Sequence, residues 1–419
     1  MRAWRWLAGV LARAGAARGR AGGFGLVLAG VVLVCAGQGG VVVRAAPMDG
    51  LAVLHGGADD QGFELAQGTR RFEFPRDHGP HPSFRHEWWY FTGRLRAAAG
   101  EQFGFELTFF RLGVMPPEAG ASAIGSTGGA ASGWQARQVY AAHFAVTDLS
   151  RKAFHARARY AREALGLGMA QGMDQGSPLE VRVQDWSLVA LPASAEAGAS
   201  PAGDAHWRLQ ADDGDYAIDL DALVAGTPVL NGNGGLSVKA AEPGAASWYY
   251  SLPRLPVHGS LKRGGKALAV SGEVWLDREW GSGGLGSGQQ GWDWHALQLS
   301  DGSALMFYTL RGADGRPDPH SAGTFVGADG RVQSLQAGDV SISATRSWDS
   351  PRGGRYPAGW QVRVPGLGLD LAVTPVLADQ ELATQPRYWE GAVDVKGTRA
   401  GQGVGGQGYV ELVGYARSK

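Results

Sequence analysis

A repeated aromatic hairpin is the feature that most limits what this chain can fold into. Residues 87–111 read EWWYFTGRL, a turn and FGFELTFFR, while residues 292–311 read WDWHALQL, a turn and ALMFYTLR. Each copy has an acid beside tryptophans, an alternating strand, a hairpin turn, an aromatic strand and a closing arginine. Asp301-Gly302 is a strong two-residue hairpin signal. Self-similarity of this kind indicates a duplicated structural unit.

The duplication predicts an all-β chain with two tandem domains. Short alternating strands broken by Gly, Asp-Gly and Pro continue after residue 62, and helical periodicity is weak throughout. The 67 glycines and 15 tryptophans agree with β structure. The copies also end alike, since SGEVWLDREWG closes the first and GQGYVELVGY closes the second. We therefore expect domains at 63–284 and 285–419, each a closed up-and-down barrel of about eight strands.

The first 46 residues form a separate segment. Five arginines and no acid precede a short apolar run and then small residues, which is the order found in a secretory signal peptide. We expect residues 1–46 to be a cleaved signal or an uncleaved N-terminal anchor. The protein would then be exported, to the periplasm, with no other spanning helix. Cys35, the only cysteine, lies in this segment, so the mature chain would have no disulfide and no thiolate metal site.

Charge and motifs exclude several functional classes. The 39 basic and 39 acidic residues balance, so nothing attracts the chain to nucleic acid. The sequence has no nucleophile elbow, P-loop, HExxH or dinucleotide fingerprint, and we expect no cofactor. The segment DHGPHPSFRHE supplies His78, His81 and His86, which are residues of the kind that bind zinc. Its glycine and two prolines bend it, however, so we expect it to cap a barrel mouth by hydrogen bonds and to hold no metal.

The acid of each hairpin copy faces an arginine across the turn. The register places Glu87 opposite Arg111 on the returning strand, and Asp293 and Arg311 hold the equivalent places in the second copy. We expect structural ion pairs near the barrel rims. A catalytic role for Glu87 is the alternative.

The aromatic residues predict either packed cores or a ligand site. Strand alternation sends Trp88 and Tyr90 to one face and Trp89 and Phe91 to the other. One pair must face the barrel interior, where the rings pack as core or line a space for an elongated apolar ligand. The candidate ligand-binding residues are Trp88, Trp89, Tyr90, Trp248, Tyr250, Trp280, Trp292 and Trp294.

Asp277 is the main catalytic candidate. In EVWLDREWG it lies between Trp275 and Trp280, at the end of a strand expected to close the first barrel. A carboxyl among indoles is poorly solvated, which raises its pKa and keeps a proton available. Indole faces also stabilise a carbocation formed when that proton reaches an alkene. The alternative is an ion pair with Arg278 or Arg254.

The long aromatic motifs resemble the AttH/CrtC family, which includes the carotenoid hydratases. The resemblance rests on DHGPHPSFRHEWWYFTGRL, FGFELTFFR, VWLDREWG, GWDWHALQLSDGSALMFYTLR and GYVELVGY, and it runs from about residue 63 to 415. It implies two lipocalin-like β-barrel domains. In the hydratases an aromatic-x-aspartate supplies the proton for adding water to a carotenoid double bond, without a redox cofactor. Trp275 and Asp277 match that motif, with tryptophan in place of the expected tyrosine.

Two functions follow from these observations. The first is an exported protein that binds a hydrophobic small molecule and assists an ABC transporter permease, as the resemblance to AttH-like members and the signal segment imply. The alternative is a cofactor-free hydratase or cyclase acting on an isoprenoid-like alkene, with Asp277 as general acid and Trp275 beside it.

Overall fold

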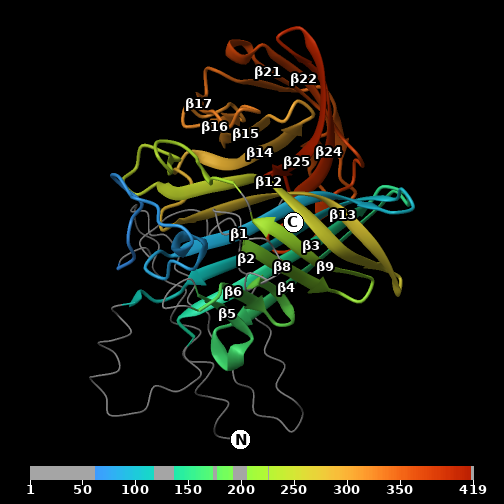
Figure 1. The fold of residues 1–419 in the computed structure, drawn as a ribbon. Coiled ribbons are helices and arrows are strands. Elements are labelled where there is room, and N and C mark those ends of the chain that lie inside the picture. The colour runs from blue at the N-terminus through green and yellow to red at the C-terminus, as the bar shows by residue number, and fades with distance from the viewer. Residues whose placement is uncertain (1–61, 118–135, 173–176, 192–204, 225, 417–419) are drawn as a thin grey trace, which may run out of the picture. The chain divides into compact units, whose positions relative to one another are not determined.

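The computed structural model describes residues 62–117, 136–172, 177–191, 205–224 and 226–416 (Figure 1). The chain is all-β in these ranges, as predicted. Its helices there are the one-turn 3₁₀ segments η2 (Arg76–His78), η3 (Ala164–Gly166) and η4 (Pro365–Leu367). None of these has the length and apolar character needed to cross a bilayer. The expected signal segment, residues 1–46, lies outside the described ranges.

The first sheet forms a nearly closed barrel. Its strands run antiparallel in the order β4-β3-β2-β1-β13-β12-β9-β8-β7-β6-β5, with β10 and β11 added beside β12. The first strand, β1, pairs with the last, β13, so the sheet curls back on itself and stays open between β4 and β5. The strands are β1 (His86–Ala97), β2 (Gln102–Gly113), β3 (Gln138–Asp148), β4 (Ala153–Arg162), β5 (Gly168–Gln171), β6 (Glu180–Val183), β7 (Trp186–Leu191), β8 (Ala205–Asp212), β9 (Tyr216–Val224), β10 (Val229–Leu230), β11 (Leu236–Val238), β12 (Ala246–Arg263) and β13 (Lys266–Gly281).

The second sheet repeats this plan as a half-barrel. Its order is β17-β16-β15-β14-β25-β24-β22-β21-β18, with β23 beside β24, and its first strand β14 again pairs with its last, β25. The strands are β14 (Gln289–Leu299), β15 (Ala304–Gly312), β16 (Ala322–Val326), β17 (Val332–Gln336), β18 (Ser341–Ala344), β21 (Trp360–Val364), β22 (Leu369–Pro375), β23 (Glu381–Leu382), β24 (Tyr388–Arg399) and β25 (Gln402–Leu412), with β19 (Ser347–Asp349) and β20 (Arg355–Pro357) as a separate hairpin.

The sequence repeat therefore corresponds to a repeat of topology. In both sheets the opening follows the fourth strand, after β4 in the first and after β17 in the second. The two copies of the aromatic hairpin are β1–β2 and β14–β15, and each supplies the strand that closes its sheet. The change from one sheet to the other falls between Gly281 and Gln289.

Strand alternation decides which aromatic rings fill the first barrel. Trp89 and Phe91 point inward and are fully buried with Trp186 and Trp207, because the period of two puts every second side chain of β1 on that face. Trp248, Tyr250 and Trp280 belong to the same core. These rings pack against each other in the core of the first barrel.

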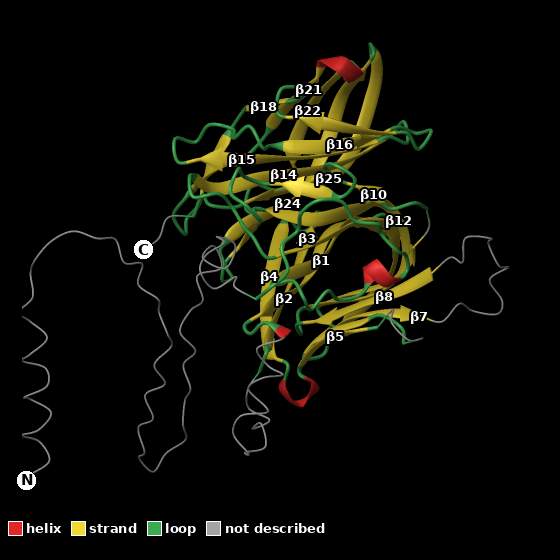
Figure 2. Ribbon diagram, turned by 90° about the vertical axis from the view of Figure 1, so that its left-hand side faces the viewer, coloured by secondary structure: helices red, strands yellow, loops and turns green. Residues whose placement is uncertain are grey.

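The other face of β1 packs against the second sheet. Figure 2 shows the strands of the second sheet stacked over those of the first. Tyr90 and Trp275 from the first sheet meet Trp294 and Tyr409 from the second in one hydrophobic cluster. Gly104 permits this approach, since a Cβ there would stand 2.8 Å from the Cβ of Ala392.

Candidate functional site

A cavity of about 140 Å³ lies between the two sheets, on the outer face of the first barrel. On β13 the alternation sends Asp277 and Glu279 to this outer face and Arg278 and Trp280 to the inner one. Strands β14, β15 and β25 supply the opposite wall. The lining combines aromatic rings with titratable groups, and includes Trp88, Tyr90, Tyr249, Trp292, Trp294 and Tyr308.

Asp277 lies in the wall of this cavity with its carboxyl group held by three donors. Ser251 Oγ at 2.5 Å and Trp275 Nε1 at 2.7 Å donate to Oδ1. The Tyr249 hydroxyl donates to Oδ2 at 2.6 Å. Burial has the largest effect and raises the pKa of Asp277 to about 7, although the three hydrogen bonds oppose it. A carboxyl with such a pKa can give or take a proton near neutral pH.

No arginine neutralises Asp277 in the part of the chain that the structure describes. Arg278, its neighbour in sequence, points the other way and pairs with Glu87 at 2.9 Å. Arg254 pairs with Glu273 at 2.7 Å. The ion pair considered as the alternative for Asp277 is therefore absent from the described residues.

The second domain reaches Asp277 through two of its donors. Trp294 Nε1 donates to the Tyr249 hydroxyl at 3.2 Å. Asn231 Nδ2 donates to Ser251 Oγ at 2.8 Å, and Thr324 Oγ1 of the second sheet donates to Asn231 Oδ1 at 2.8 Å. The site is thus built from both sheets, and neither domain alone completes it.

A half-buried cation, Lys239, lies on the same wall. Lys239 Nζ is 3.2 Å from a Glu279 carboxylate oxygen, which also accepts a hydrogen bond from Ser247 Oγ. The ammonium group lies 4.0 Å from the ring centroid of Tyr308 and 5.4 Å from that of Tyr249. Burial has the largest single effect and lowers the pKa of Lys239, but the charge and hydrogen bond of Glu279, together with the charges of Tyr308 and Asp277, more than offset it, and the pKa is raised. The lysine therefore stays charged.

A second titratable acid enters the cavity from β25. Glu411 is the strand partner of Trp294. Burial raises its pKa to about 8, against a hydrogen bond from Trp292, and the charges of Asp277 and Glu279 raise it further. Glu411 is therefore mostly protonated at neutral pH.

Two more buried carboxyl groups lie between the sheets. Tyr90 donates to Glu390 Oε1 at 2.7 Å, and Thr108 donates to Glu106 Oε1 at 2.5 Å. The second oxygen of each has no partner among the described residues. Burial raises the pKa of Glu106 to about 8 and that of Glu390 well above its ordinary value.

Glu87 lies away from the cavity in a buried network of charges. It pairs with Arg111 and Arg278 and accepts hydrogen bonds from the His81 backbone. The two arginines hold the pKa of Glu87 well below its ordinary range, although burial acts against them. The Arg278 guanidinium also lies 3.9 Å from the Trp89 ring. The carboxylate is thus paired with two arginines and fully enclosed.

The histidine segment packs over one end of the first barrel core. His78 Nδ1 hydrogen-bonds the Tyr250 hydroxyl at 2.6 Å, and its carbonyl accepts from Trp89 Nε1 at 3.0 Å. The His81 ring stacks on Trp280 with centroids 3.8 Å apart. Within the described ranges no group of three metal-binding side chains converges here or elsewhere. The segment acts as a hydrogen-bonded cap.

The equivalent pair in the second domain is less enclosed. Arg311 Nε donates to Asp293 Oδ1 at 2.8 Å, and the Tyr415 hydroxyl donates to Oδ2 at 3.0 Å. The guanidinium lies 3.8 Å from the Tyr415 ring. This pair ties β14 and β15 to the residues that follow β25.

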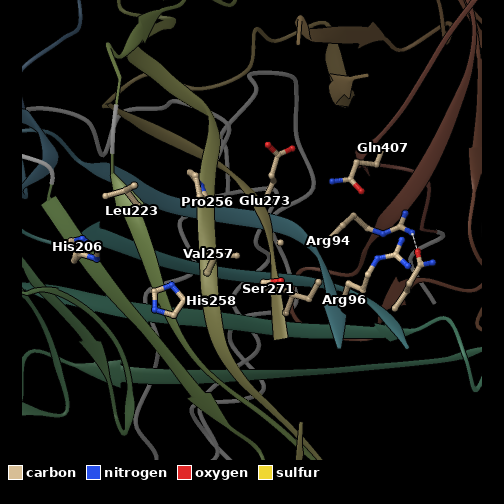
Figure 3. Close-up of a pocket in the computed structure, with 13 residues that line it drawn as sticks. Arg94, Arg96, His206, Leu223, Pro256, Val257, His258, Ser271, Glu273 and Gln407 are labelled. Carbon is tan, nitrogen blue, oxygen red and sulfur yellow. Dashed lines mark hydrogen bonds between the residues drawn. The ribbon is translucent and has the colours of Figure 1, made fainter. Parts of the chain in front are cut away.

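A larger, more open groove of about 590 Å³ lies elsewhere on the first barrel. Figure 3 shows its polar side chains, among them Arg94, His206 and His258. Arg94 pairs there with Asp394 at 3.0 Å and His206 with Asp221 at 2.6 Å, and both aspartates are at least partly exposed. Glu273, the one acid among its described lining residues, pairs with Arg254. We therefore place the candidate site in the smaller cavity, where an acid is buried without a cationic partner.

The eight aromatic residues expected to bind a ligand fall into two groups. Trp88, Tyr90, Trp292 and Trp294 line the cavity, and Trp275 supports its acid. The other four, which are Trp89, Trp248, Tyr250 and Trp280, pack in the core of the first barrel. The physical reason is strand alternation, which puts neighbouring rings on opposite faces.

Four residues of the candidate site were not predicted from the sequence: Tyr249, Ser251, Lys239 and Glu411. Tyr249 could have been found, because it shares the outer face of β12 with Ser251, the strand partner of Asp277. Lys239 follows a three-residue strand, and Glu411 comes from the other domain, so no local pattern connects either one to Asp277.

A family model and two solved structures match most of this chain, and one further relative matches about half of it. A family model described as AttH-like matches residues 65–415. A crystal structure described as a candidate AttH from Nitrosomonas europaea is 32% identical, has a TM-score of 0.70, and covers 84% of this chain and 100% of its own. Kievitone hydratase from Nectria haematococca is 18% identical with a TM-score of 0.60, over 85% and 98% of the two chains, which shows a shared fold. A dehydratase, asqC of Emericella nidulans, is 24% identical over 218 residues, which are 49% of this chain and 60% of that relative.

Proposed function

This chain belongs to the AttH-like family, and we propose that it adds water to, or removes it from, a hydrophobic small molecule without a cofactor. The reaction takes place in the cavity between the two sheets. Asp277 gives and takes the proton, Tyr249, Ser251 and Trp275 hold its carboxyl group, and the surrounding rings bind the apolar part of the substrate.

One observation carries this proposal. Asp277 is only 3% exposed, lines the cavity, and has no cationic partner among the described residues. Burying an ionisable group without a counter-charge is costly, and here it moves the pKa to about 7, where both forms of the carboxyl are populated at neutral pH. The names of two similar proteins, a hydratase and a dehydratase, agree with this chemistry.

The proton balance needs one carboxyl group. In hydration, one carbon of the double bond gains a proton, the other gains the oxygen of water, and the water loses a proton. Asp277 can supply the first proton and recover the second, or take the second and pass it on. Nothing is oxidised or reduced, and the acid ends each cycle in its starting state.

The test uses water labelled with ¹⁸O and a panel of unsaturated apolar probes that includes 4-phenylbut-3-en-2-one and geraniol. Mass spectrometry detects products that have gained one labelled water. We expect Asp277→Asn to slow this gain by about 100-fold or more. Asp394→Asn, at a carboxyl 57% exposed on the surface, is the matched control and should keep the wild-type rate. An Asp277→Asn protein with the wild-type rate would contradict the proposal.

Binding without a reaction is the second candidate function, and the aromatic wall of the cavity supports it. Trp88, Trp292 and Trp294 offer stacking surfaces to any flat apolar molecule. Native mass spectrometry of the purified protein would detect a retained molecule. Retention without turnover would favour a carrier, and the export of the protein and its association with an ABC transporter permease are predictions that belong to that function.

A further inference from the structure

Lys239 is a half-buried cation that the proposed proton transfer does not use. It follows β11 and extends into the cavity wall, and its side chain is 15% exposed. Burying an ammonium group costs free energy unless acceptors surround it. The hydrogen-bond acceptors around this lysine therefore decide what it can bind.

The Lys239 ammonium group has more N–H donors than hydrogen-bond acceptors around it. An ammonium group has three N–H donors. Within the described ranges its hydrogen-bond acceptor is Glu279, at 3.2 Å. The rest of its surroundings are the faces of Tyr308 and Tyr249, at 4.0 Å and 5.4 Å from the ring centroids. Donors remain that an oxygen atom of a bound molecule could satisfy.

Lys239 is also the one positive charge among the described lining residues. His86 is the other basic group there, and burial lowers its pKa to about 3, so it is neutral. Among the described lining residues, Lys239 is therefore the positive charge that can stabilise negative charge developing on a bound ligand.

The lysine and the acid lie on the two sides of one tyrosine. The hydroxyl of Tyr249 holds Asp277 at 2.6 Å, while its ring lies 5.4 Å from Lys239 Nζ. A molecule lying across Tyr249 would meet the carboxyl group near one of its atoms and the ammonium group near another. In a conjugated carbonyl compound the carbonyl oxygen and the α-carbon are two bonds apart, so the oxygen can face the ammonium group while the α-carbon faces the carboxyl group.

We propose that the substrate carries a carbonyl group conjugated with the reacting double bond, and that Lys239 binds the carbonyl oxygen. This inference rests on the proposed function and names its substrate class. In the reverse direction the substrate is a β-hydroxy carbonyl compound.

The chemistry balances with the groups present. The Asp277 carboxylate takes a proton from water as the water oxygen bonds to the β-carbon. The π electrons of the double bond move to the α-carbon and onto the carbonyl oxygen, where the Lys239 ammonium stabilises the enolate. Asp277 then gives the same proton to the α-carbon, which restores the ketone and the carboxylate. The net change is the addition of one water.

The charge of Lys239 also affects the intermediates of a conjugated carbonyl compound and of an isolated alkene differently. Protonating an isolated alkene makes a carbocation, and a neighbouring ammonium group repels it. The enolate has the opposite charge and is attracted. The Lys239 ammonium can thus donate a hydrogen bond to the carbonyl oxygen and to its enolate, whereas an isoprenoid-like hydrocarbon has no oxygen to accept it.

The test compares two probes with the same carbon skeleton, 4-phenylbut-3-en-2-one and 1-phenyl-1-butene. Isothermal titration calorimetry measures binding of each to the full chain. We expect the ketone to bind about tenfold more tightly, the effect of one hydrogen bond to a charged group. Lys239→Met should remove the difference by weakening binding of the ketone. Lys239→Met leaves the Glu279 carboxylate without its cationic partner. The double variant Lys239→Met with Glu279→Gln removes both charges and serves as the control, and we expect the same result from it.

The outcomes separate this inference from the proposed function. Equal binding of both probes by the wild type, or a ketone preference that survives in the double variant, overturns the inference. A ketone preference that depends on Lys239 supports it, even if Asp277→Asn leaves labelled-water addition unchanged and so contradicts the proposed reaction.

Discussion

The hydroxyl of Tyr249 donates to Asp277 Oδ2 at 2.6 Å from the neighbouring strand. The same hydroxyl accepts a hydrogen bond from Trp294 of the second sheet at 3.2 Å. The tyrosine therefore fixes the acid of the first domain against the second. Domain packing and proton transfer depend on one side chain, and the position of Asp277 responds to changes in either sheet.

The pH dependence of activity follows from this contact. If the ionised Asp277 takes the proton of water, activity rises with pH through a midpoint near 7, its pKa. The groups around it are Tyr249, Glu279, Lys239 and Glu411. Tyr249→Phe removes a donor that stabilises the carboxylate, so the midpoint should move upward by about one unit. Initial rates of water addition to the double bond of 4-phenylbut-3-en-2-one, measured from pH 5 to 9, would give this midpoint. A rate that falls through pH 7 would instead indicate alkene protonation.

The buried Glu87 network should matter for stability and not for catalysis. Glu87→Gln leaves Arg111 and Arg278 in the interior without their counter-charge, and should cost about 3–5 kcal/mol of unfolding free energy. Urea titration followed by tryptophan fluorescence measures it. The control is Glu273→Gln, whose pair with Arg254 is partly exposed and should cost at most about 1 kcal/mol. Similar losses in both variants would contradict the structural assignment.

Glu106 should destabilise the protein as the pH rises. Its folded pKa of about 8 lies above its ordinary value of 4.5, so the folded state holds a proton that the unfolded chain releases. Stability is then complete below pH 4.5 and is lost between there and pH 8. Glu106→Gln removes this ionisation and should be the more stable protein at pH 9, by about 2 kcal/mol. Melting temperatures of both proteins at pH 5 and pH 9 test it, and a gap that does not widen with pH would refute it.

Substitutions of the neighbours Trp88 and Trp89 should have different effects, the first on ligand binding and the second on stability. Trp89 is fully buried in the barrel core, so Trp89→Ala should cost about 3–5 kcal/mol of stability. Trp88 lines the cavity and is only partly buried. Trp88→Ala should keep most of the stability and weaken binding of 4-phenylbut-3-en-2-one several-fold. Chemical unfolding and calorimetry on both variants decide this, and the reverse pattern would place the site inside the barrel.

Much of the fold could be predicted from local sequence patterns. The alternating strands and the copied hairpin at 87–111 and 292–311 indicated two β-barrel domains, and the structure has two barrel-like sheets of the same topology. Alternation also put Trp88 and Trp89 on opposite faces, as the structure shows. These features follow from the period of two along a strand and from turn residues, which are properties of neighbours in the chain.

The place of the site could not be predicted in this way. Asp277 was chosen because of its neighbours Trp275 and Trp280, yet only Trp275 shares its face, and the space it lines lies between the domains and outside the barrel. Lys239, Trp294 and Glu411 come together there only when the second sheet packs on the first. The sequence alone thus determined the strands, their faces and the duplication, since these depend on short-range periodicity. The tertiary structure decided which face became a core, where the cavity formed and which charges were buried in it, because burial and pKa depend on contacts between residues far apart in the chain.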